Sequence, residues 1–252
     1  MAILVTVPFS HYCEKARWAL DYTRYDYVEE GHVPGLHRIA VKRATSPRTS
    51  VPVLVTREST LADSTDILEH ADAFAEQDRK LYPADAAGRA EVQALEDDYD
   101  ERLGPHIRRV MYFYLLPHPS MTLRLMAQRT PRWELATVRA LFPLVRRAMR
   151  RFMQIDAQTA AESRDTMLCV FDDVERRLAD GRPYLAGDRF TAADLTFAAL
   201  SGVGVMAPEH SIAYPSPDEL PEAAANLVRE MQARPVGAFV RRIYREHRLH
   251  GR

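Results

Sequence analysis

The sequence has 252 residues, of which 46% are hydrophobic, and its 34 basic and 35 acidic side chains leave a formal net charge of −1. This length suits one large domain or two small ones, with enough apolar residues for a core that needs no disulfides. The balanced charge argues against nucleic acid or an anionic membrane as partner, and no apolar run approaches the ~20 residues of a membrane span.

The cysteines and histidines indicate neither a disulfide framework nor a metal site. Cys13 and Cys169 are the only cysteines, and the nine histidines show no metal-binding spacing. The segment 1–7 has no basic region and no small-residue cleavage site, so we expect no signal peptide. These features predict a cytoplasmic protein with reduced thiols and no bound metal.

The first part of the chain alternates short apolar runs, typical of buried strands, with stretches in which apolar residues recur at helical spacing. In chain order, the expected segments are a strand at 3–7, a helix from Ser10, a strand at 26–33, a helix at 36–43, a loop at 45–50, a strand at 51–56 and a helix from Asp63. Strands that alternate with helices in this way predict an α/β layer.

After Tyr82 and Pro83 the chain has no further convincing strand. Helical patterns cover the remaining segments, which are 88–116, 134–153, 157–180 and the chain from Ala192 onward. We therefore expect two domains, an α/β domain at 1–82 and an all-helical domain at 88–252.

Ser10 lies where the first strand passes into the first helix. A serine there is most simply an N-cap, whose oxygen accepts a backbone N–H of the first turn. The same position also suits catalysis, because the helix N-terminus and the Ser10 hydroxyl would both stabilise a thiolate bound beside them. Cys13, one turn later, is either a small buried hydrophobic residue or a redox thiol in a Ser-x-x-Cys pattern.

Two further segments allow both a structural and a ligand-binding interpretation. Val51 and Pro52 form either an ordinary strand start or a cis bond in a tight turn, which would leave the Val51 backbone free to pair with an extended peptide ligand. Asp63 and Ser64 either cap the next helix or bind a ligand. In the second case Ser64 and the helix N–H groups receive a carboxylate, and Asp63 meets an ammonium group.

Taken together, the order and spacing of these segments resemble those of glutathione transferases of the serine and cysteine types, notably the zeta, omega and beta-like groups. The resemblance covers most of the chain, with 110–160 the least matched. It is carried by PFSHYCEKARWAL at 8–20, VPVL at 51–54, LADSTDIL at 61–68, LYP at 81–83, FTAADL at 190–195 and QARP at 232–235. It implies a thioredoxin-like α/β domain followed by an all-α domain.

The resemblance also implies roles for the motif residues. Ser10 falls on the family's catalytic serine or cysteine. Val51 and Pro52 fall on its cis-proline strand, and Asp63 and Ser64 on the motif that holds the γ-glutamyl end of glutathione. The implied protein is a cytoplasmic homodimer that uses glutathione as co-substrate and a small hydrophobic electrophile as second substrate, without metal, nucleic acid or membrane.

The sequence departs from the family before the proline strand. Thr49 and Ser50 stand where the family often has Gly-Lys, so a basic contact to the glycine carboxylate of glutathione falls to Arg48 or His37. The absence of a cysteine at position 10 argues against thiol–disulfide chemistry by the usual nucleophile. The expected function is conjugation of glutathione to a hydrophobic electrophile. The alternatives are a non-catalytic binding protein of the same fold and a glutathione-dependent isomerase, dehalogenase or reductase.

Aromatic residues near the expected site have two interpretations. Tyr12, Tyr112 and Phe113 are either core side chains or walls of a hydrophobic substrate pocket that faces Ser10.

Two further helical patterns concern folding or the surface. Thr191 and Asp194 suit a capping box, with Phe190 as a hydrophobic staple onto Leu195. Five arginines share one helical face, opposite Leu144, Ala148 and Phe152; they are Arg139, Arg146, Arg147, Arg150 and Arg151. That face is most simply solvated, and an anionic partner is the alternative.

Overall fold

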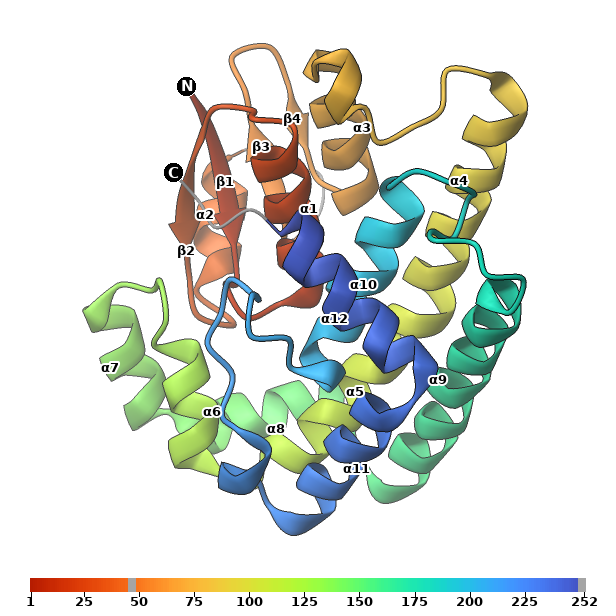
Figure 1. Cartoon of the computed structure of the whole chain (residues 1–252). Helices are drawn as coiled ribbons and strands as arrows, with labels where there is room; N and C mark the ends of the chain where they lie inside the picture. The colour runs from red at the N-terminus through yellow and green to blue at the C-terminus, as the bar shows by residue number, and fades with distance from the viewer. Residues whose placement is uncertain (45–48, 249–252) are drawn as a thin grey trace.

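The computed structural model describes residues 1–44 and 49–248. It confirms the expected architecture, a small thioredoxin-like α/β unit followed by helices (Figure 1). Arg48 and most of the expected loop at 45–50 lie outside the described residues.

The sheet has the strand order β2-β1-β3-β4. Its strands are β1 (Ala2–Thr6), β2 (Tyr27–Gly31), β3 (Val53–Val55) and β4 (Thr60–Leu61). β2 runs parallel to β1, whereas β1 and β3, and likewise β3 and β4, are antiparallel. β4 is not predicted from the sequence, because two residues are too few to show an alternating pattern.

Helices cover both faces of this sheet; they are α1 (His11–Tyr22), α2 (His37–Arg43) and α3 (Ser64–Phe74). Leu4 of β1 and Leu54 of β3 belong to the core shared with α1 and α3. Val5 and Val53, which alternate with them along the strands, belong to a smaller cluster with residues of α2. The prediction that the first strand is buried on both faces is therefore confirmed.

The rest of the chain is helical. After a short 3-10 turn (Gln77–Arg79) come α4 (Ala86–Asp98), a π-helical turn (Tyr99–Leu103), α5 (Gly104–Leu115), α6 (Pro119–Met126), α7 (Arg132–Ala140), α8 (Phe142–Phe152), α9 (Ala157–Leu178), α10 (Ala192–Val205), a 3-10 turn (Pro217–Glu219), α11 (Glu222–Ala233) and α12 (Pro235–His247). All residues of α10 are buried, and this helix packs against α1, α4, α5 and α12.

The helical pattern expected at 134–153 is present, and the structure divides it into two helices. α7 ends at Ala140, and α8 begins at Phe142 with Pro143 in its first turn. Proline has no N–H to donate to the preceding turn, so it tolerates the start of a helix and interrupts its interior.

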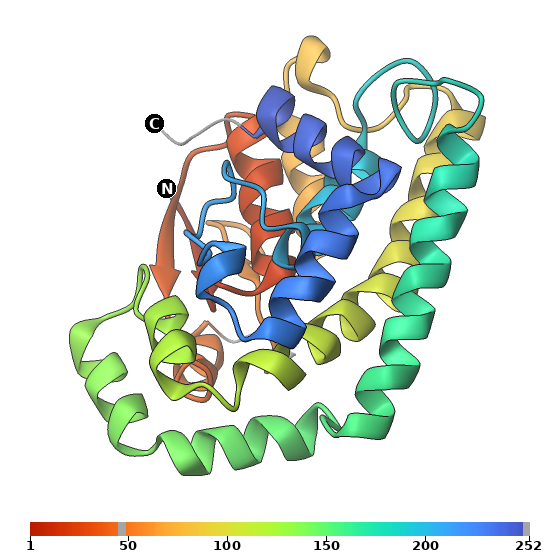
Figure 2. The same ribbon diagram turned by 60° about the horizontal axis from the view of Figure 1, so that its bottom comes forward.

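α8 packs differently from the expected pattern. Its arginines are mostly exposed, but so are the apolar residues opposite them, with Leu144 65% and Phe152 80% exposed. Phe142 and Met149 are the residues that α8 buries instead. Figure 2 shows α7 and α8 along an outer edge of the molecule, where only one side of each helix meets other elements.

The capping box at the start of α10 is confirmed. The Asp194 carboxylate accepts the Thr191 N–H at 2.9 Å through Oδ2 and the Leu185 N–H at 2.7 Å through Oδ1. Phe190 is buried and stacks on the ring of His247, with centroids 4.1 Å apart. The motif therefore fixes the start of the most deeply buried helix.

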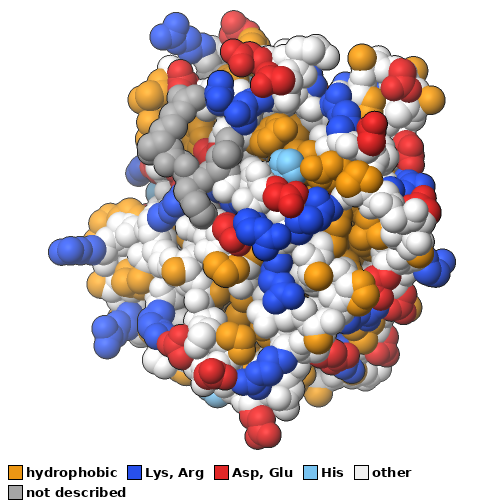
Figure 3. All heavy atoms as spheres, in the orientation of Figure 1, with side chains coloured by type: hydrophobic (Ala, Val, Ile, Leu, Met, Phe, Trp, Pro, Cys, Tyr) orange, Lys and Arg blue, Asp and Glu red, His pale blue; other side chains and the backbone are white. Residues whose placement is uncertain are grey.

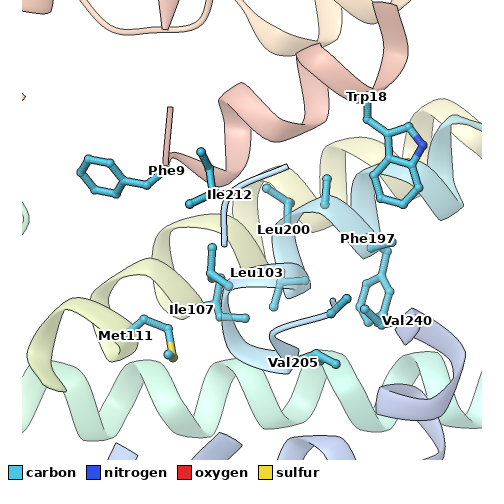
Figure 4. Close-up of a cluster of buried hydrophobic side chains, with 14 of the residues drawn as sticks. Phe9, Trp18, Leu103, Ile107, Met111, Phe197, Leu200, Val205, Ile212 and Val240 are labelled. Atoms are coloured by element: carbon cyan, nitrogen blue, oxygen red, sulfur yellow. The ribbon is translucent and has the colours of Figure 1, made fainter. Parts of the chain in front are cut away.

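One hydrophobic core joins the sheet to the helices. Figure 4 shows part of it, with Trp18 of α1 near Phe197 of α10, and Phe9 and Met111 nearer the other end of the cluster. The positions of α1 and α5 are therefore set by shared packing.

The face of the molecule drawn in Figure 3 shows no dominant charge. On the face drawn in Figure 3, basic and acidic side chains are interspersed. Among residues 1–44 and 49–248, no helix has the length and apolar content needed to cross a membrane.

Candidate active site

Three segments meet at one end of the sheet. β1 leads into Ser10, and because β3 is antiparallel to β1, the start of β3, which follows Pro52, lies beside the end of β1. β4 is antiparallel to β3, so its end, which leads into Ser64, lies at the same end. The topology therefore brings together the three segments that the sequence analysis singled out.

The Ser10 hydroxyl is not used as a helix cap. Ser10 occupies the N-cap position of α1 with φ −77° and ψ 128°, yet its side chain accepts no backbone N–H. The side chain is partly exposed and lies within hydrogen-bonding reach of the Cys13 thiol. The simplest structural interpretation of this serine is therefore wrong, and its hydroxyl stands at the positive end of a 12-residue helix.

Cys13 is a buried residue of the core. Its side chain has no exposed surface, and burial raises the pKa of the thiol to about 12. A thiol that stays protonated at neutral pH is a poor nucleophile. The structure therefore favours the interpretation of Cys13 as a small hydrophobic residue.

The peptide bond between Val51 and Pro52 is cis, as the sequence predicts. Pro52 is buried and Val51 is half-buried. His37 braces this loop, since its Nδ1 accepts the Gly35 N–H at 3.1 Å and its ring also bonds the backbone of Thr49. With these bonds made, His37 is not the free basic contact that the sequence analysis considered.

Asp63 and Ser64 have different roles at the start of α3. Asp63 is the N-cap, and its Oδ1 accepts the Thr65 N–H at 3.0 Å. Ser64, the first helical residue, is only 5% exposed, and in the described part of the chain neither its N–H nor its hydroxyl has a hydrogen-bond partner. Polar groups left unpaired at a helix N-terminus suit an anionic ligand.

A buried charged cluster, which the sequence did not indicate, joins α1 to the first turn of α3. Lys15 Nζ has no exposed surface and contacts Asp100 Oδ2 at 2.5 Å, Glu96 Oε1 at 2.7 Å and Thr65 Oγ1 at 3.1 Å. Thr65 Oγ1 also donates to Asp100 Oδ2 at 3.1 Å. Because Thr65 follows Ser64, this cluster fixes the start of α3 against α1 and the helical domain.

Tyr12 belongs to the same region and has a structural role. Its hydroxyl donates to the carbonyl of Asp100 at 2.8 Å, within the π-helical turn, where the regular helical bonds are interrupted. A Cβ at Gly104 would lie 2.0 Å from the Tyr12 hydroxyl oxygen, so only glycine allows this approach. Tyr12 therefore holds the helical domain against α1.

An apolar pocket is lined by Phe9 and His11, the residues before and after Ser10. The residues that line it are Phe9, His11, Arg108, Met111, Tyr112, Leu115, Leu116, Thr122, Leu125, Met149, Val203 and Tyr214. Of the three candidate wall residues, Tyr112 lines this pocket and Tyr12 does not. Phe113 does not either, and its ring lies edge-on to Tyr114 at 5.3 Å.

Two buried histidines give folding a pH dependence. Burial lowers the pKa of His11 to about 3 and that of His210 to about 4, below the ordinary value of 6.5. The unfolded chain therefore binds more protons than the folded one below pH ~6.5, and stability is lost as the pH falls through this range. At about pH 5 we expect a loss of roughly 2 kcal/mol per histidine.

Denaturant unfolding at a series of pH values tests this expectation. His210→Asn keeps an acceptor for the Ile212 N–H, which His210 Nδ1 accepts at 3.0 Å, but removes the titrating group. We expect the variant to lose less stability between neutral pH and about pH 5 than the wild type. Equal losses in the two proteins would contradict the assignment to His210.

No metal site is evident in the described ranges 1–44 and 49–248, where no group of three or more histidine, cysteine or acidic side chains is arranged to hold an ion.

Comparisons with solved structures show the same fold. A glutathione S-transferase from Rhodospirillum rubrum F11 is 21% identical, with 97% of this chain and 91% of that one covered and a TM-score of 0.59. A theta-class enzyme from Xanthomonas axonopodis pv. citri, solved with glutathione bound, is 19% identical over 99% and 98% of the two chains, with a TM-score of 0.59. A beta-etherase from Sphingobium sp. strain SYK-6 is 20% identical over 97% and 98%, also with a TM-score of 0.59.

At these identities the likeness concerns the fold alone, and no curated protein matches the sequence. Family models match both parts of the chain. The model of the glutathione S-transferase N-terminal domain matches residues 4–79, and that of the C-terminal domain matches residues 127–224. The chain therefore belongs to the glutathione transferase family.

Proposed function

We propose that this protein binds glutathione at the end of its sheet and joins the glutathione sulfur to a hydrophobic electrophile. Residues 1–82 form the glutathione-binding domain and residues 88–252 the domain that holds the electrophile. The observation that carries the proposal is Ser10, whose hydroxyl makes no capping bond at the N-terminus of α1 and whose chain neighbours Phe9 and His11 line an apolar pocket.

Ser10 would act on the thiol directly. Its O–H donates to the bound sulfur, and the positive end of α1 adds to this stabilisation. Together these effects supply about one to two units of pKa lowering, at about 1.4 kcal/mol per unit. The proton leaves to solvent, the thiolate attacks the electrophilic carbon, and the leaving group departs with its electron pair.

The rest of glutathione would lie along the sheet end. Ser64 receives the γ-glutamyl carboxylate at the N-terminus of α3, because neither its N–H nor its hydroxyl has a partner within the described residues. Asp63 meets the ammonium group, and Val51 pairs with the peptide through its backbone, next to the buried Pro52.

The alternatives differ in what they require of the site. A reductase that uses Cys13 is disfavoured, because burial keeps this thiol protonated. A non-catalytic protein would bind glutathione without turnover, since fold alone does not imply activity. We further propose that the protein is a cytoplasmic homodimer, as its family resemblance implies.

Retention on glutathione-agarose, followed by a conjugation assay with a panel of chromogenic electrophiles, tests the proposal. We expect retention that free glutathione reverses and conjugation that saturates with glutathione. Retention without conjugation of any electrophile would favour the non-catalytic alternative, and failure to bind glutathione at all would contradict the proposal.

Ser64→Ala is expected to raise the KM for glutathione about tenfold and to leave kcat nearly unchanged. The variant loses a hydrogen bond to a charged group, worth about 1.5 kcal/mol, which is made equally in ground and transition states. Ser59→Ala is the control, since within the described residues the Ser59 hydroxyl bonds only the Thr56 hydroxyl in the same turn. An unchanged glutathione affinity in calorimetry of Ser64→Ala would place the carboxylate elsewhere.

A further inference from the structure

The apolar pocket contains one charged side chain. Among its lining residues, Arg108 carries a permanent charge, and His11 is neutral because burial lowers its pKa to about 3. Arg108 is half-buried, and within residues 1–44 and 49–248 it has neither an ion pair nor a hydrogen bond. The other lining residues are apolar or uncharged, so this charge has no counterpart in the pocket.

Neighbouring arginines on the same stretch of chain are engaged. Arg109 donates from Nε to the Met153 carbonyl at 3.1 Å and from Nη1 to Ser163 Oγ at 2.7 Å. Arg102 forms ion pairs with Asp98 and Asp173. Arg108 thus differs from its neighbours in facing the pocket without a partner. An arginine that only covers apolar surface would reach water with its charged head, and this is the alternative that the test addresses.

Arg108 shares its pocket with the two residues that flank Ser10. Phe9 and His11, which precede and follow Ser10, line the same pocket. The charge of Arg108 is close enough to lower the pKa of His11 and to act on Tyr112. Arg108 therefore lines a pocket whose wall includes both chain neighbours of Ser10, so a substrate in this pocket would lie next to the chain neighbours of Ser10 and in contact with Arg108.

We propose that Arg108 binds a carboxylate on the electrophile, so that the preferred substrates are apolar molecules with one anionic end. Guanidinium pairs with carboxylate through two parallel hydrogen bonds, and a partly buried site strengthens that pair. The carboxylate takes no part in bond making. The sulfur forms the new bond to carbon, the leaving group departs with its electrons, and the thiol proton goes to solvent.

The inference rests on the proposed function for its reaction, so the test uses two substrates that differ only in charge. We choose a chloronitrobenzoate with the carboxylate para to the chlorine, and the corresponding carboxamide. The wild type should show the higher kcat/KM with the carboxylate after correction for the uncatalysed rates. In Arg108→Met, the ratio of kcat/KM for the carboxylate to kcat/KM for the carboxamide should fall about tenfold to a hundredfold, because the carboxylate loses one hydrogen-bonded charge partner.

Variants separate this role from a structural one. Arg109→Met removes the engaged neighbour and should leave the substrate ratio unchanged. Arg108→Lys keeps the charge and should recover part of the preference. An Arg108→Met protein with the wild-type ratio would overturn the proposal.

A binding experiment keeps the inference testable if neither substrate is turned over. Calorimetry without glutathione compares nitrobenzoate with nitrobenzamide, which lack the leaving group. We expect the wild type to bind nitrobenzoate about tenfold more tightly and Arg108→Met to bind both equally. Equal binding of the two by the wild type would contradict the assignment of Arg108, whereas absent turnover with selective binding would contradict only the transferase function.

Discussion

Ser10→Ala is expected to slow conjugation about tenfold to a hundredfold at neutral pH. The variant removes one hydrogen bond to an ionised acceptor, which stabilises the thiolate by about 1.5–3 kcal/mol. The defect should shrink as the pH rises, because the thiol then ionises without help. The rate of conjugation at saturating glutathione, measured across pH, reports this directly.

Stability measurements on the same protein separate catalysis from capping. When a serine that caps a helix is replaced by alanine, the protein loses about 1 kcal/mol of stability. The Ser10 side chain makes no capping bond, so we expect a smaller loss. Ser10→Cys should gain thiol-transferase character, since a thiol at a helix N-terminus becomes a nucleophile. A Ser10→Ala protein that melts earlier but keeps wild-type kinetics at every pH would refute the catalytic role.

Lys15→Met is expected to lower the free energy of unfolding by about 3–5 kcal/mol. It leaves Glu96, which has no exposed surface, and the mostly buried Asp100 without their positive partner. Because Lys15 also bonds Thr65, next to Ser64, the variant should bind glutathione more weakly as well. Denaturant unfolding and calorimetry with glutathione measure the two effects.

Two further variants make this interpretation specific. Lys42→Met removes an exposed lysine of α2 and should change stability by less than about 0.5 kcal/mol. Adding Glu96→Gln to Lys15→Met removes one of the stranded carboxylates and should recover part of the loss. If Lys15→Met unfolds at the wild-type denaturant concentration, the buried cluster does not stabilise the fold.

Features encoded by neighbouring residues could be predicted from the sequence. The strand that leads into Ser10 is a continuous apolar run, and the cap at Asp63 and the capping box at Thr191 and Asp194 each lie within four residues. The cis bond before Pro52 was one of the two alternatives that the Val-Pro pair allowed, and it was predicted because a ligand-facing loop needs such a turn. Local patterns of this kind determine where helices and strands begin.

The features that could not be predicted from the sequence depend on contacts between residues far apart in the chain. Lys15 meets Asp100 across 85 residues, and on the helix its charge indicated only a polar position. Tyr12 has the spacing of a pocket or core aromatic, and only the π-helical turn shows that its hydroxyl has a partner. Arg108 was part of a basic pair in the sequence, and the fold alone distinguishes it from Arg109.

The most direct test of the account is the pKa of the glutathione thiol on the enzyme, followed by the ultraviolet absorbance of the thiolate during a pH titration. In the wild type we expect this pKa to lie about one to two units below that of free glutathione. In Ser10→Ala we expect it to rise most of the way back to the value of free glutathione. Ser59→Ala should titrate like the wild type. A bound thiol with the same pKa in the wild type and in Ser10→Ala would contradict the central claim that Ser10 stabilises the thiolate.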